Sequence, residues 1–184
     1  ETSAHGRELW FSDGTESGTM LVKDIKTGSE SGITSLAPQS SYVVPGTNYI
    51  LFAADDGVNG IEPWLSDGTS GGTSMYTNVN PGANSSNPSN FYVVTPYIFF
   101  SAETVAGGRE PFVGFGGSAG MLMNIAPGAN SSNPYAFILN GAENRVLFNA
   151  SNNTAGNELW QTTIGTTSLV KDIVPGANGG SLTN

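Results

Sequence analysis

The chain has 184 residues, no cysteine and a formal net charge of −9 at pH 7, and only 11% of its residues are charged, against about 25% in an average soluble domain. Its six basic residues are scattered, which excludes the positive surface expected of a protein that binds nucleic acid or anionic membranes. No apolar run approaches about 18 residues, so no membrane insertion is predicted.

Strand-forming runs such as NYILFAA, NFYVVTPYIFFSA and RVLFNA alternate with stretches rich in Gly, Pro, Ser and Asn. This pattern predicts an all-β protein with many turns. The absence of cysteine removes disulfides and thiolate metal sites but leaves the cellular compartment open.

A four-fold internal repeat organises the sequence. One glutamate marks each module, and the glutamates are separated by 54, 48 and 48 residues. The polar string PGANSSNP occurs at Pro81–Pro88 and Pro127–Pro134, and a third copy begins at Pro175. Repeats of this length are typical of arrays with one supersecondary unit per repeat. The four marked segments are ELWFSDGT at Glu8, EPWLSDGT at Glu62, EPFVGFGG at Glu110 and ELWQTTIG at Glu158.

The third module gives the clearest set of predicted strands. Short links join four apolar runs, and the longer PGANSSNP segment follows them. Such a unit predicts a β-propeller-like array of four-stranded antiparallel blades, with about three and a half repeats. We predict a single repeat domain over 1–184, with modules at about 1–35, 36–82, 83–128 and 129–184. The four predicted strands are 90–95, 97–102, 110–115 and 121–126.

The strands of one blade are named a, b, c and d in chain order. The first residues align with the segment that follows strand b of the third module, and the last residues precede a strand a. We therefore expect strands c and d of one blade and then three complete blades. The edge of the strand near Glu8 would lack a partner within this sequence, so either the sequence is part of a longer protein or a neighbouring chain pairs with this edge. Repeated head-to-tail contacts of this kind produce filaments unless the ring closes.

Three segments resemble the ELWxxDGT repeat proteins, a family of large, repetitive, mostly bacterial proteins thought to be exported. These are ELWFSDGT-ESGTMLVKDI at 8–25, EPWLSDGT-SGGTSMYTNV at 62–79 and LVKDIVPG at 169–176. The resemblance extends over four copies and weakens in modules three and four, where GFGG and TTIGT replace SDGT. It implies a propeller-like fold and an extracellular or cell-surface location. The family has no established catalytic residues to transfer.

Four sequons are candidate glycosylation sites, so glycans are expected partners if the source modifies asparagine. Two of them occupy the same loop of successive modules, which favours a surface position. The candidates are Asn84, Asn130, Asn149 and Asn152.

The repeated glutamates admit two interpretations. Asp55, Asp56 and Glu62 gather hard oxygen donors in one loop, as Ca²⁺ prefers. The corresponding loops of the other modules carry fewer carboxylates, so calcium is a weak candidate and no other cofactor is predicted. We favour the alternative, in which each glutamate accepts backbone N–H groups and fixes the turn between strands b and c.

One aromatic residue per module could stack on sugars, but packing between adjacent blades is the favoured interpretation. SDGT at Ser12–Thr15 and Ser66–Thr69 predicts turns, and Gly114–Gly120 a strand turn rather than a phosphate loop. His5 is the only histidine, and no nucleophile motif accompanies it, so we expect a solvated loop residue. The aromatic positions are Trp10, Trp64, Phe112 and Trp160.

These patterns predict a non-enzymatic extracellular structural protein that self-associates into a homopolymer, such as a filament or surface layer. The alternative is a carbohydrate- or protein-binding propeller module of a larger adhesin. A third hypothesis, a propeller glycosidase, needs paired carboxylates, for which the repeated glutamates are the sole candidates.

Overall fold

The computed structural model describes residues 2–33 and 39–176. In these residues the chain is all-β, with 14 strands and no helix. The strands form four antiparallel sheets. Among the described residues there is therefore no helix long and apolar enough to cross a membrane.

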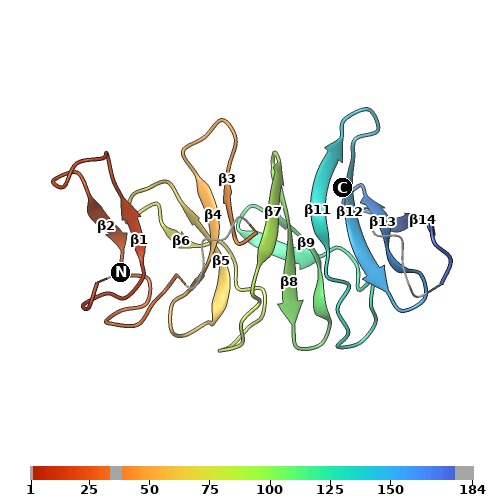
Figure 1. The fold of residues 1–184 in the computed structure, drawn as a ribbon, viewed down its shortest axis with the longest axis horizontal. Helices are drawn as coiled ribbons and strands as arrows, with labels where there is room; N and C mark the ends of the chain where they lie inside the picture. The colour runs from red at the N-terminus through yellow and green to blue at the C-terminus, as the bar shows by residue number, and fades with distance from the viewer. Residues whose placement is uncertain (1, 34–38, 177–184) are drawn as a thin grey trace. The chain divides into compact units, whose positions relative to one another are not determined.

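Consecutive strands pair in each sheet, as the labels in Figure 1 show. The first sheet has two strands and the other three have four each, which confirms the expected strands c and d followed by three complete four-stranded units. The first sheet contains β1 (Leu9–Phe11) and β2 (Met20–Lys23), and the second β3 (Ser41–Val43), β4 (Ile50–Asp55), β5 (Ile61–Ser66) and β6 (Ser74–Met75). The third contains β7 (Ser89–Val94), β8 (Tyr97–Thr104), β9 (Gly108–Phe115) and β10 (Ser118–Met121), and the fourth β11 (Tyr135–Asn140), β12 (Arg145–Asn152), β13 (Gly156–Thr162) and β14 (Thr167–Lys171).

The chain divides into two compact units, Glu1–Ser89 and Asn90–Asn184. The first contains the sheets β1–β2 and β3–β6, and the second contains β11–β14 and nearly all of β7–β10. The predicted module boundaries at 82 and 128 fall between β6 and β7 and between β10 and β11, while the boundary at 35 lies outside the described residues. The single domain and the propeller-like arrangement of the sheets stay predictions.

The fourth strand of module three differs from the prediction. We expected it at 121–126, but β10 is Ser118–Met121, because the turn is confined to Gly116 and Gly117 and Ser118 already pairs with Phe115. The chain then leaves the sheet. The N–H groups of Ile125 and Ala126 bind a glutamate side chain instead of a strand.

The core of the first unit lies between its two sheets. Leu9 and Val22 of β1 and β2 pack with Phe52, Ala54 and Trp64 of β4 and β5. Two isoleucines of the connecting segment, Ile25 and Ile33, belong to the same cluster. The aromatic side chain of β5 therefore packs on the sheet that precedes it.

The second unit repeats this arrangement. Phe99 of β8 packs with Phe148 and Trp160 of β12 and β13, and Ile125 comes again from the connecting segment. Each four-stranded sheet contains one pair of aromatic residues that lie opposite each other on adjacent strands. Such a pair stabilises the folded state by roughly 0.2–1 kcal/mol relative to a pair of alanines. The pairs are Phe52 with Trp64, Phe100 with Phe112 and Phe148 with Trp160.

In three modules the glycine two residues before the repeated glutamate lies against the backbone of the connecting segment, which we did not anticipate although G-x-E recurs in all four modules. Gly108 has φ +62°, and a Cβ at this position would lie 2.0 Å from the backbone oxygen of Asn130. Gly6 and Gly60 meet the oxygens of Glu30 and Asn84 in the same way. The glycine lets the b–c turn lie directly against the connection between sheets.

We predict that Gly108→Ala destabilises the protein more than Gly116→Ala does. Gly116 has nearly the same φ, +59°, but nothing lies within 4 Å of its Cβ position. Gly116→Ala should lower the free energy of unfolding by about 1–2 kcal/mol, the cost of a left-handed backbone conformation for a residue with a side chain. Gly108→Ala should lose more, because its Cβ also clashes with the backbone of Asn130. Urea unfolding followed by tryptophan fluorescence measures both, and equal losses would contradict the close-approach explanation.

Candidate functional site

The repeated glutamates are buried and accept backbone N–H groups. The Glu110 carboxylate accepts hydrogen bonds from the N–H groups of Ile125, Ala126 and Ser132 at 3.0, 3.2 and 3.2 Å. It also accepts one from the Ser132 hydroxyl. Both carboxylate oxygens are therefore used within the fold.

The other three glutamates have equivalent partners. The donors lie in the segment after the last strand of the same sheet, 15 to 24 residues further along the chain. The expected type of partner, backbone N–H groups, is therefore confirmed, and the structure adds where in the chain these donors lie. The donors are Ile25, Lys26 and Gly32 for Glu8, Val79 and Ser86 for Glu62, and Ile173 and Val174 for Glu158.

The two serines of PGANSSNP complete this contact. The Ser131 hydroxyl oxygen accepts the N–H of Arg109 at 2.9 Å, and the Ser132 hydroxyl donates to Glu110. Ser85 and Ser86 do the same for Ile61 and Glu62, at 2.9 and 2.7 Å. The polar string is thus part of the glutamate site.

Burial raises the pKa of the Glu62 and Glu110 carboxyl groups above the ordinary value. Removal from water disfavours the charged form, and the hydrogen bonds from Ser86 and Ser132 oppose this effect in part. Such shifts also occur at catalytic carboxylates. Here hydrogen-bond donors of the protein itself occupy both carboxylate oxygens of Glu62 and of Glu110. We therefore attribute the raised pKa of these two groups to their burial in the fold.

The calcium candidates do not converge on one site. The Asp55 carboxylate accepts a hydrogen bond from the Lys26 ammonium, with 2.8 Å between Nζ and Oδ2. The Asp56 carboxylate accepts hydrogen bonds from the N–H groups of Val58 and Asn59. Glu62 is bound by the donors described above. No group of three or more histidine or carboxylate residues in the described part of the chain could hold a metal. In the described structure these three side chains therefore do not form a metal-binding cluster.

Three of the four repeated aromatic residues lie in the core. Trp64, Phe112 and Trp160 are 6, 4 and 5% exposed, so these three cannot form the alternative sugar-stacking platform. Trp10 is 39% exposed. Its strand β1 pairs with β2 and with no other described strand, whereas β5, β9 and β13 each have neighbours on both sides. Trp10 therefore lacks the phenylalanine that lies opposite Trp64 and Trp160.

A second apolar surface lies on the fourth sheet. Ile138 and Leu147 pair across β11 and β12, and Ile138 is 58% exposed. In the third sheet the corresponding residues are Tyr92 and Phe99, which pack against the core of the second unit. In the third sheet this face is covered by Phe148 and Trp160 of the fourth sheet. The equivalent face of the fourth sheet is exposed at Ile138.

The sequons occupy different environments. Asn84 and Asn130 are exposed in the loops between sheets. Asn149 lies in β12, where it pairs with Tyr135 and Leu159 and is 7% exposed. It is therefore unsuitable as a glycan site in the folded protein. Asn152 is partly buried, and its side-chain oxygen accepts the N–H of Thr154 and of Ala155.

The remaining predictions concern turns and His5. Both SDGT segments form turns in which an aspartate binds the threonine two residues later, and these contacts lower the pKa of Asp13 and Asp67. His5 is not simply a solvated loop residue, since its Nδ1 lies 3.1 Å from a carboxylate oxygen of Asp24. The turn in 114–120 is Gly116–Gly117, as a strand turn requires.

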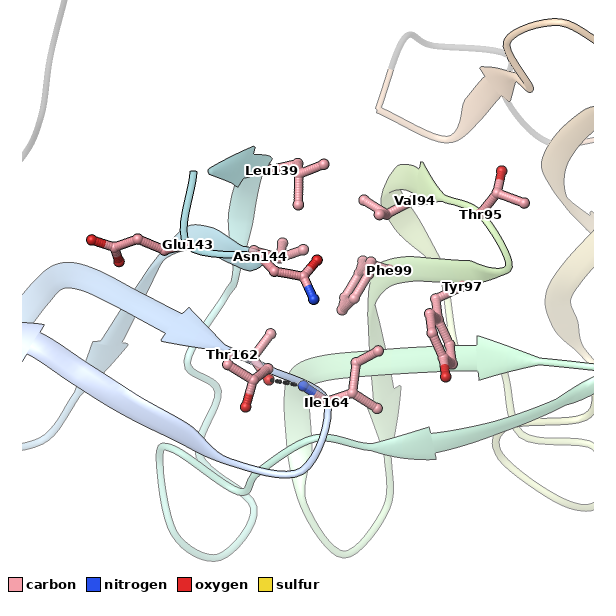
Figure 2. A pocket seen from close by; sticks show the side chains of 11 residues that line it. Val94, Thr95, Tyr97, Phe99, Leu139, Glu143, Asn144, Thr162 and Ile164 are labelled. Atoms are coloured by element: carbon pink, nitrogen blue, oxygen red, sulfur yellow. Dashed lines mark hydrogen bonds between the residues drawn. The ribbon is translucent and has the colours of Figure 1, made fainter. Parts of the chain in front are cut away.

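A cavity of about 410 Å³ lies within the second unit. The turns β7–β8, β11–β12 and β13–β14 border it. Figure 2 shows Tyr97, Phe99, Asn144 and Ile164 directed toward one another around it. Nothing in the sequence analysis indicated this site, because its lining residues come from three hairpins of two different sheets.

No protein-family model, curated protein or solved structure matches the chain. The described sheets and contacts define an all-β repeat protein. The resemblance to ELWxxDGT repeat proteins rests on the sequence motifs.

We predict that the stability difference between the wild type and Glu110→Gln depends on pH. Because burial raises the pKa of Glu110, the protonated carboxyl contributes stability that is complete below the ordinary pKa of 4.5 and is lost as pH rises through the folded value. The wild type should lose stability relative to the variant as pH rises from about 4 to about 8. Urea unfolding across this range measures the difference. Glu16→Gln is the control for the loss of one carboxylate, since Glu16 is exposed on the surface.

We predict glycans on Asn84 and Asn130 when the protein is secreted from a host that glycosylates asparagine. Both side chains are exposed, whereas a glycan on Asn149 would have to enter β12. Glycopeptide mass spectrometry of the secreted, folded fraction measures occupancy. Modification of Asn149 in that fraction would contradict the structure.

Proposed function

We propose that this chain is a non-enzymatic, extracellular structural repeat protein whose copies associate head to tail through the first and fourth sheets. The observation that carries the proposal is the exposure of Trp10, at a position where Trp64 and Trp160 are buried. Exposed apolar surface of this kind marks interaction sites.

The proposed contact between copies has the same form as a contact that occurs within each unit. In each unit the aromatic residue of a third-position strand, Trp64 or Trp160, packs on the sheet that precedes it. Trp10 has the same place in its sheet, and the Ile138–Leu147 face has the place that receives Trp160 in the third sheet. One copy therefore supplies the kind of side chain that the other copy receives.

The unpaired edge of β1 adds hydrogen-bonding capacity to this contact. Its backbone has one described neighbour, β2, so N–H and C=O groups on the other side are available for an added strand. A contact between two different surfaces forms an open chain unless its rotation closes a ring. This supports a filament or surface layer, with the sheets as blades of a propeller-like array.

Other observations favour an extracellular structural role. Low charge, two exposed sequons in corresponding loops and the resemblance to exported repeat proteins support the location. Support for a non-enzymatic role comes from the repeated glutamates, the candidate acids of a glycosidase. Backbone donors within the fold engage each of them.

We predict that Trp10→Lys and Ile138→Lys each weaken self-association by at least about tenfold, because a central buried aromatic or aliphatic contact is replaced by a charge. Sedimentation velocity over a concentration series measures association. Val105→Lys changes a side chain that is 70% exposed in the β8–β9 turn and should leave association unchanged.

Mixing the variants tests the geometry. Each variant retains one intact surface, so an equal mixture of Trp10→Lys and Ile138→Lys should form dimers that do not grow further. A contact between two β1 strands would instead leave Ile138→Lys fully competent to associate. A wild-type protein that stays monomeric at every concentration would overturn the proposal.

A further inference from the structure

The cavity of the second unit has the size and lining of a small-molecule site. Its volume of about 410 Å³ falls within the range of about 300–1,000 Å³ typical of ligand pockets. Tyr97 and Phe99 supply aromatic surface, and Val94, Leu139 and Val146 supply aliphatic surface. Asn144 and three threonines, Thr95, Thr162 and Thr163, add neutral polar groups.

Ile164 adopts a backbone conformation that is unfavourable for its type. Its φ is +71°, in the turn that the Thr163 N–H closes by donating to the Thr166 carbonyl at 3.1 Å. The corresponding β9–β10 turn has Gly116 and Gly117, with φ of +59° and +83°. A β-branched residue at positive φ is a true outlier, and such strain gathers at functional sites. Here it places an aliphatic side chain at the cavity.

Apart from the Glu143 carboxylate, the polar groups that line the cavity are neutral. The Asn144 amide is exposed and points into the cavity, and no hydrogen bond ties it to the described part of the chain (Figure 2). Glu143 is the one carboxylate in the lining; it lies 3.5 Å from Arg145 and is directed away from Tyr97 and Phe99. No Lys or Arg lines the cavity to bind an anion.

We propose that this cavity binds a neutral pyranose sugar. The C–H face of a sugar ring suits the Tyr97 and Ile164 side chains, and the Asn144 amide offers a donor and an acceptor to its hydroxyl groups. The Glu143 carboxylate, with no cation in the lining, disfavours acidic sugars. The inference does not depend on self-association.

NMR titration of the ¹⁵N-labelled protein with methyl glucoside, methyl galactoside and methyl mannoside tests the proposal, with glucuronate as the anionic probe. At least one neutral glycoside should give saturable shifts confined to the turns around Asn144 and Ile164, and glucuronate should give none. Overturning results are the absence of saturable shifts with all three glycosides, shifts elsewhere in the protein, or equal binding of glucuronate.

The Ile164→Gly variant distinguishes a role of Ile164 in ligand binding from a role in stability. Glycine removes the strained φ, so the variant should unfold at a higher temperature than the wild type while it binds the glycoside more weakly. Asn144→Gly keeps the positive φ and deletes the amide, and should weaken binding about tenfold, as expected for a lost hydrogen bond. Asn133→Gly is the matched control, since Asn133 also has positive φ (+48°) but does not line the cavity. Unchanged affinity in both cavity variants would sink the proposal.

Discussion

The carboxylate of the repeated glutamate holds each sheet to the segment that leads away from it. This segment has left the strand, so its N–H groups have no ladder to join, and the glutamate gathers two or three of them at once. Burying an ion is unfavourable unless it is hydrogen-bonded. The glutamate, the glycine two residues earlier and the serines of PGANSSNP therefore depend on one another, because together they hold the connecting segment against the turn.

This unit also explains how the sheets come to pack. Ile25 and Ile125 each donate an N–H group to a glutamate while their side chains enter the core between two sheets. Polar and apolar contacts are therefore coupled at the same residue. The repeat can vary elsewhere, as the loss of SDGT in the last two modules shows, because the SDGT hydrogen bonds are confined to the turn.

The two proposals depend on departures from the repeat. Trp10 and Ile138 are exposed although their counterparts in other sheets are covered, which supports association of copies. Ile164 stands at positive φ where an equivalent turn has glycine, which supports a ligand site. The regular positions of the repeat report on architecture, and both proposals rest on positions that depart from the regular environment or conformation.

By itself the sequence determined the all-β class, the strand count, the turns and the type of partner of the glutamates, because strand runs and turn chemistry act over a few residues. Only the tertiary structure decided which backbone groups meet the glutamates, which of the repeated aromatic residues is exposed, that Asn149 is buried and that three turns border a cavity. The reason is that these features depend on residues 15 or more positions apart or on neighbouring sheets. The same local pattern, E-L-W, gives an exposed tryptophan at Trp10 and a buried one at Trp160.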